Sequence, residues 1–166
     1  MIRPHKMDVY EDDIKDFFVA KYNFKQEISV GNRKRVDLGL FNEKGELICI
    51  AEVKINDFSS AIGQILYYEF LLGKSVEKKI VLSYYEFKES CHGDAVKNKK
   101  KIKDKKDALL NNLRFFMKIK KELGIDFLFY VPFREEYVKL EDCYKFFDQG
   151  DIEEDIDFDQ FFWKKG

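Results

Sequence analysis

Apolar positions in the first third of the chain predict one helix followed by three strands. Residues 8–22 repeat apolar side chains at helical spacing, and Asp8 and Glu11 stand at its start in capping-box spacing. Residues 24–30 and 33–41 alternate as strands do, and residues 46–55 are nearly all apolar, as in a strand covered on both faces. The polar sequence NEKG joins the last two strands as a hairpin. We expect Val36, Leu38 and Leu40 to share one face of the middle strand.

The remaining pattern predicts two longer helices and two further strands. The first helix, at about 59–72, is capped by Asp57 or Ser59, ends at Gly73 and is apolar nearly all round, which predicts a buried helix. The second helix runs from about residue 108 to Gly124. Strands are expected at 78–87 and 126–133, with a polar, lysine-rich connection over 91–108.

The element order α-β-β-β-α-β-α-β predicts an α/β fold with a mixed β-sheet flanked by helices. At 166 residues the chain is long enough for one domain with its own core, expected at about residues 8–133. Residues 141–166 form an acidic, aromatic extension with nine carboxylates and three lysines.

Three ionisable residues interrupt the second and third predicted strands, namely Asp37, Glu52 and Lys54. An unpaired buried charge costs several kcal/mol, so these side chains must be paired, bound to a metal or exposed in a cleft. The hairpin brings Asp37 near Glu52 if the strand register allows it. Two carboxylates suit Mg²⁺ or Mn²⁺, and an ammonium beside them suits metal-assisted phosphodiester cleavage.

Asp37 followed by Glu52-Val53-Lys54 resembles the PD-(D/E)xK nuclease superfamily. Gln64 and Tyr68, four residues apart in GQILYY, resemble the Gln-x-x-x-Tyr signature of its RecB-like branch. The stretch from residue 24 to residue 70 is most similar to the N-terminal nuclease domain of type I restriction-enzyme motor subunits. The resemblance covers about residues 8–85 and implies a restriction-endonuclease-like sheet with an α-β-β-β-α-β core. Val36 replaces the proline for which the superfamily is named, and no helicase motor follows.

The resemblance also implies roles for individual residues. Asp37 and Glu52 would be metal ligands with the Val53 carbonyl as a third, and Lys54 would be the catalytic lysine. Gln64 would tie its helix to that lysine or to the substrate, supported by Tyr68. Glu11 matches the first-helix acidic position that archaeal Holliday-junction resolvases also use, and would be an accessory ligand or a hydrogen-bond acceptor.

Each of these signals also has a structural explanation. Glu-x-Lys on a strand is often a solvated ion pair, and its context in an apolar strand after Asp37 and before Gln64 favours the functional interpretation. Glu11 could serve the helix dipole instead of a metal. Gln64 could simply be a polar residue at the sheet edge.

Basic residues provide candidate contacts to nucleic acid. Arg33, Lys34 and Arg35 precede Asp37 and could hold phosphates or could simply be an exposed strand start. Seven lysines lie between residues 97 and 106, with Lys99, Lys100 and Lys101 at their centre. Such a run suits salt-dependent contact with the nucleic-acid backbone, and is equally typical of a solvated loop.

The composition says more about the cellular compartment of the protein than about its binding partner. The net charge is −1, but the first 140 residues carry +5 and the last 26 carry −6. This asymmetry is compatible with a nucleic-acid-binding body and also with an ordinary charged surface. Three widely spaced cysteines, an N-terminus without a signal-peptide pattern and no apolar run of membrane length predict a cytoplasmic protein that does not enter membranes.

The sequence therefore predicts a Mg²⁺- or Mn²⁺-dependent endonuclease acting on DNA, in restriction, junction resolution, homing or another mobile-element task. By analogy alone, a domain this small would act as a homodimer to cut both strands. The alternative is a catalytically inactive nucleic-acid-binding or interaction module on the same fold, within a larger defence or repair complex.

Overall fold

The computed structural model describes residues 10–55, 57–97, 102–132 and 135–149. Its elements, in chain order, are α1 (Glu11–Tyr22), β1 (Lys25–Gly31), β2 (Lys34–Phe41), β3 (Leu47–Lys54), α2 (Phe58–Leu72), β4 (Glu77–Ser83), α3 (Tyr84–Lys97), α4 (Ile102–Leu123), β5 (Ile125–Val131), β6 (Glu136–Lys139) and α5 (Leu140–Gln149). The predicted α-β-β-β-α-β beginning is confirmed. None of the helices in these described ranges combines the length and the apolar character needed to cross a membrane.

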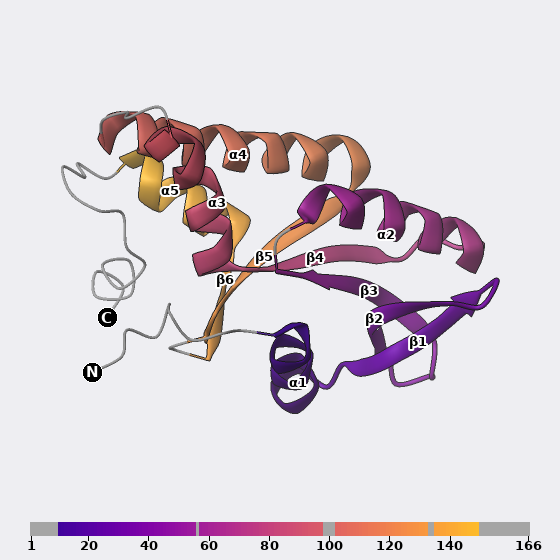
Figure 1. The fold of residues 1–166 in the computed structure, drawn as a ribbon. Helices are drawn as coiled ribbons and strands as arrows, with labels where there is room; N and C mark the ends of the chain where they lie inside the picture. The colour runs from indigo at the N-terminus through magenta and orange to yellow at the C-terminus, as the bar shows by residue number, and fades with distance from the viewer. Residues whose placement is uncertain (1–9, 56, 98–101, 133–134, 150–166) are drawn as a thin grey trace.

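The six strands form one mixed sheet in the order β1-β2-β3-β4-β5-β6 (Figure 1). The three strands β1 to β3 pair antiparallel, β3, β4 and β5 pair parallel, and β6 returns antiparallel to β5. The β3–β4 crossover contains α2, which begins directly after Lys54 and the short segment that follows it. The carboxyl end of β3 therefore lies beside the first turn of α2.

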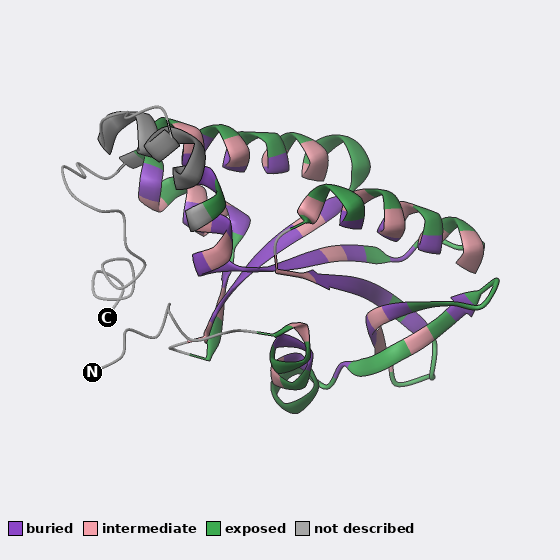
Figure 2. Ribbon diagram, viewed as in Figure 1, coloured by how far each residue is buried: buried purple, intermediate pink, exposed green. Residues whose placement is uncertain are grey.

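Helices cover both faces of the sheet, but unequally. Helices α2, α3, α4 and α5 lie on one face, and α1 alone lies on the other (Figure 1). The larger core forms beneath the four helices, while a smaller core of Ile14, Phe18 and strand residues forms beneath α1. Figure 2 shows that the central strands are buried along most of their length.

Several local signals that the sequence provides are confirmed. Asp57 is the N-cap of α2, where its carboxylate accepts the Ser60 N–H, and Gly73 ends the helix with a φ of 68°. In the β2–β3 hairpin the Asn42 side chain accepts two backbone N–H groups, and Gly45 adopts a φ of 79°. These turns fix where β3 begins and where α2 starts, and so they fix the position of Glu52.

The second half differs from the prediction in its helices. Strand β4 ends at Ser83, and α3 takes over the segment from Tyr84 that we expected to remain a strand. The Ser83 hydroxyl donates to the Glu86 carboxylate, so this Ser-x-x-Glu pair is the helix-start signal that the aromatic residues concealed. The lysine-rich connection is also wrong as a loop, since α3 extends to Lys97 and α4 begins at Ile102.

Three smaller predictions need correction. Strand β6 and helix α5 follow β5, and the predicted order α-β-β-β-α-β-α-β did not include them. Helix α1 starts later than predicted, with Tyr10 as N-cap donating its N–H to the Asp13 carboxylate, and Asp8 lies outside the described residues. Helix α2 is not buried all round, because Phe70 is 77% exposed.

Candidate functional site

Strands β2 and β3 change their mode of pairing at Asp37. The backbone ladder runs from Phe41–Leu47 to Leu38–Ala51. Beyond it, the Val53 N–H donates to Asp37 Oδ2 over 2.8 Å, and the Asp37 N–H donates to Glu52 Oε1 over 3.1 Å. Each carboxylate thus takes the place of a ladder carbonyl, and the register brings Asp37 and Glu52 side by side.

The alternation of side chains also breaks at Asp37. Val36 joins the core beneath α2, whereas Leu38 joins the core beneath α1, so the two do not share a face as predicted. Glu27 on β1 lies between the paired positions Gln26–Leu38 and Ile28–Val36, and has a φ of 56°. A positive φ is uncommon for glutamate and is often retained at functional sites. Both strands are therefore irregular where the carboxylates meet.

Lys15 reaches this irregular point from α1. Its side chain is almost fully buried, and its Nζ lies 2.9 Å from Glu27 Oε1 and 3.4 Å from Asp37 Oδ1. Burial lowers the pKa of Lys15, but the hydrogen bond with Glu27 and the charge of Asp37 outweigh burial and raise it above the ordinary value. Lys15 therefore remains charged and holds α1 against the two acidic strands.

Glu52 is the most deeply buried carboxylate of the group, at 3% exposure. Burial and the negative charge of Asp37 raise the pKa of Glu52 to about 8, although the nearby charge of Lys54 acts in the opposite direction. Two adjacent carboxylates repel each other in a poorly solvated place, and a bound cation would remove that repulsion. The electrostatics of this pair fit a divalent metal.

The ligand set also fits Mg²⁺ or Mn²⁺ in kind. Asp37 and Glu52 would supply carboxylate oxygens. A strand residue directs its N–H and C=O to the same neighbour, so the Val53 carbonyl faces the side of Asp37 that its N–H contacts. Mg²⁺ is commonly held by one or two carboxylates together with waters and substrate phosphates. Two carboxylates and one carbonyl therefore suffice for such an ion.

Helix α2 contributes Gln64 and Tyr68. Tyr68 is buried, and burial together with the charges of Glu52, Asp37 and Glu27 raises its pKa. Tyr68 therefore lies close to the carboxylate group. Gln64 stands one turn earlier, and its Oε1 is buried without a hydrogen-bond partner. An unpaired buried amide oxygen is uncommon in folded proteins and marks a place where a partner is missing.

Glu11 was expected beside Asp37 and Glu52, and the structure does not group it with them. Within the described ranges, no group of three or more Asp, Glu, His or Cys side chains is arranged to hold a metal, so Glu11 does not complete a triad with Asp37 and Glu52. Lys15, one turn after Glu11, reaches Asp37 instead. Sequence reasoning missed both Lys15 and Glu27. The position of Lys15 directly after the buried Ile14 was the available signal.

The basic residues are only partly placed. Arg33 lies in the turn between β1 and β2, with a φ of 58°, and Lys34 and Arg35 begin β2 as exposed residues. The Asn32 side chain donates to the Tyr67 hydroxyl over 3.0 Å, which ties this turn to α2. Lys99, Lys100 and Lys101 lie outside the described residues.

Comparisons with known proteins complete this description. Neither the protein-family models, nor the curated proteins, nor the solved structures give a match to this chain.

Proposed function

We propose that this protein is a Mg²⁺- or Mn²⁺-dependent endonuclease that hydrolyses DNA phosphodiester bonds. The observation that carries the proposal is the interlocked pair of Asp37 and Glu52, in which burial and mutual repulsion raise the pKa of Glu52 to about 8. The first six elements also follow the core order expected of PD-(D/E)xK nucleases, and a restriction-endonuclease-like fold is part of the proposal.

The chain's own groups would divide the work. Asp37, Glu52 and the Val53 carbonyl would hold the cation, which supplies charge neutralisation at the phosphate and a more acidic bound water. Lys54, half-buried two residues after Glu52, would stabilise negative charge on the phosphate. Lys15 would hold Asp37 in place, and Gln64 and Tyr68 would position the reacting groups from α2. Exposed Arg33, Lys34 and Arg35 would contact phosphates farther along the strand.

A second candidate function is binding of nucleic acid without cleavage, and it follows from the position of Glu11. Since Glu11 is not gathered at the site, the same fold could bind nucleic acid without cutting it, as an interaction module in a larger complex. The presence of Lys54 close enough for its charge to act on Glu52 favours the nuclease. Neither a homodimer nor a larger assembly is needed for cleavage of one strand, and both remain proposals.

The test is a cleavage assay of the purified protein. Supercoiled plasmid, single-stranded DNA, a four-way junction and single-stranded RNA are incubated with Mg²⁺, with Mn²⁺ or with a chelator. We expect metal-dependent cleavage of at least one DNA substrate, lost in Asp37→Asn and Lys54→Ala but retained in Lys74→Ala, an exposed lysine in the turn after α2. Cleavage that survives both site substitutions would overturn the assignment. Binding of every substrate without cleavage would favour the interaction module.

A further inference from the structure

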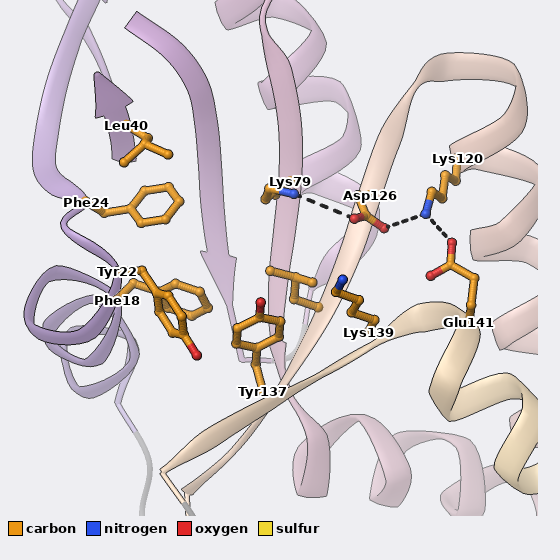
Figure 3. Close-up of a pocket in the computed structure, with 11 residues that line it drawn as sticks. Phe18, Tyr22, Phe24, Leu40, Lys79, Lys120, Asp126, Tyr137, Lys139 and Glu141 are labelled. Atoms are coloured by element: carbon orange, nitrogen blue, oxygen red, sulfur yellow. Dashed lines mark hydrogen bonds and ion pairs between the residues drawn. The ribbon is translucent and has the colours of Figure 1, made fainter. Parts of the chain in front are cut away.

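A separate cavity of about 410 Å³ lies on the face of the sheet that α1 covers (Figure 3). Helix α1 has 12 residues and packs over β1 and β3, so it leaves the beginning of β4 and β5 open on that face. Central strands of a mixed sheet are normally covered on both faces. The volume lies within the range of small-molecule sites, and the residues that line it differ from those at Asp37 and Glu52.

One wall of the cavity is aromatic. It consists of Phe18, Tyr22, Phe24 and Tyr137, with Leu40 and Leu128 beside them. Phe18 and Phe24 are buried, whereas Tyr22 is 39% exposed and meets Tyr137 edge-to-face at 5.3 Å. Part of this aromatic surface is therefore open to a planar ligand.

The opposite wall is charged. Lys79 lies 3.7 Å from Asp126, Asp126 lies 3.3 Å from Lys120, and Lys120 pairs closely with Glu141, so two ammonium groups alternate with two carboxylates. Lys139 adds a third ammonium and makes no ion pair with any residue that the structure describes. Figure 3 shows Lys139 on the same wall, next to Tyr137 and Asp126.

A structural ion network would be complete with the four alternating groups alone. The fifth group, Lys139, gives the wall a net charge of +1. Its charge helps to lower the pKa of Glu141, but among the described residues no carboxylate lies within ion-pair distance of it. Stacking on tyrosine and an ion pair with lysine are two contacts through which proteins hold nucleotides, since every base has a planar face and every nucleotide has a phosphate.

We propose that this cavity binds a nucleotide unit, with its base against Tyr22 and Tyr137 and its phosphate at Lys139. The unit could come from a free mononucleotide or from a nucleic-acid strand, and both present the same chemistry. The proposal does not rest on cleavage at Asp37 and Glu52, because binding can be measured without metal and in the Lys54→Ala variant.

The test is titration of the full chain with AMP, dAMP, adenosine, inorganic phosphate and a four-nucleotide DNA strand in the presence of a chelator. Binding is followed by calorimetry and by NMR shifts of the tyrosine rings. We expect AMP or dAMP to bind at least tenfold more tightly than adenosine or phosphate alone. Tighter binding of the short strand than of either mononucleotide would identify a nucleic-acid chain as the source, and the reverse order would identify a free nucleotide.

Substitutions distinguish nucleotide binding in the cavity from non-specific binding of the nucleotide to the charged protein surface. Lys139→Ala should weaken binding roughly tenfold, Lys139→Arg should restore most of it, and Tyr22→Leu should remove the preference for a nucleotide over phosphate. Lys74→Ala and Tyr10→Leu, both at exposed positions outside the cavity, should bind as the unchanged protein does. Equal affinity for phosphate and AMP, or an equal loss in Lys74→Ala and Lys139→Ala, would overturn the proposal.

Discussion

Two buried lysines, Lys15 and Lys78, show how the same residue type serves two different purposes in this protein. Both are 9% exposed or less. Lys78 on β4 lies 2.7 Å from Glu69 of α2, and the same carboxylate accepts the Val76 N–H over 3.2 Å. One ammonium meets one carboxylate there, and the pair closes the connection between α2 and β4.

Lys15 faces a surplus of negative charge. It contacts Glu27 and Asp37, and Asp37 in turn interlocks with Glu52. Lys15 also lies 3.8 Å from the exposed Asp12 carboxylate. With Lys54 at the end of β3, two ammonium groups therefore serve four carboxylates. We call Lys78 with Glu69 the balanced centre. There, the Lys78 ion pair and the Val76 hydrogen bond overcome burial and lower the pKa of Glu69. We call Lys15, Asp37 and Glu52 with their neighbours the surplus centre. There, burial and the negative charge of Asp37 raise the pKa of Glu52. Under the proposed function, a cation from outside the chain would complete the second centre.

The largest expected effect is on the cleavage rate, which should depend on the surplus centre and not on the balanced centre. Asp37→Asn or Lys54→Ala should lower the cleavage rate by roughly 10²–10³-fold or more, because each removes a group that acts on charge at the phosphate. Lys78→Met should leave the cleavage rate per folded molecule unchanged. Plasmid nicking rates at matched protein concentrations test this, and a comparable loss in Lys78→Met would erase the distinction.

The next effect is on the free energy of unfolding, to which the ion pair of the balanced centre should contribute. Lys78→Met should lower the free energy of unfolding by about 3 kcal/mol, because the partly buried Glu69 loses its partner; the value is discounted for the 24% exposure of the Glu69 side chain. The double variant Lys78→Met/Glu69→Leu should recover most of this loss. Urea denaturation of the three proteins is the measurement. If the double variant is no more stable than the single one, Lys78 and Glu69 do not form an isolated balanced pair.

Local sequence signals predicted the part of the fold that builds the site. Asn42, Gly45, Asp57 and Gly73 act within their own turns, so the hairpin and the start of α2 could be found without tertiary information. Helix α3 could not be separated from a strand by its apolar pattern, because its first residues are aromatic and buried in either case.

The candidate site was only partly predictable for a related reason. Asp37, Glu52 and Lys54 stand out because charges interrupt apolar strands. Lys15 and Glu27 lie in amphipathic segments, where charged residues are expected on the exposed face, and only the packing of α1 on the sheet brings them to Asp37. The break in alternation between Val36 and Leu38 depends on the irregular β1–β2 pairing, which periodicity does not contain.

A third test uses pH, since the pKa of Glu52 is raised to about 8 in the folded protein while an unfolded glutamate has a pKa of about 4.3. The folded state then binds the extra proton between these values, so the contribution of Glu52 to stability falls as pH rises from about 5 to 8. Relative to Glu52→Gln, the unchanged protein should lose roughly 3 kcal/mol over this range.

Denaturant titrations at pH 5, 7 and 9 measure this difference. Addition of Mn²⁺ at pH 8 should restore the lost stability in the unchanged protein and have little effect in Glu52→Gln, because a bound ligand stabilises only the state that binds it. Parallel pH curves for the two proteins, with no response to Mn²⁺, would mean that the Asp37–Glu52 pair is as balanced as the Lys78–Glu69 pair.

The smallest expected effect concerns Gln64 on α2, a half-buried residue whose amide oxygen is buried and which has no counterpart beside Lys78. Its Oε1 lacks a hydrogen-bond partner, and an unsatisfied buried acceptor costs about 1–3 kcal/mol. Gln64→Met keeps the length of the side chain and removes the amide, so it should raise the free energy of unfolding by about 1 kcal/mol while lowering the cleavage rate. Thermal melting and nicking assays on the same preparation measure both. If stability and cleavage fall together, Gln64 is a structural residue like Glu69, whereas a gain in stability with a loss of cleavage places the unpaired amide among the groups that act on the substrate.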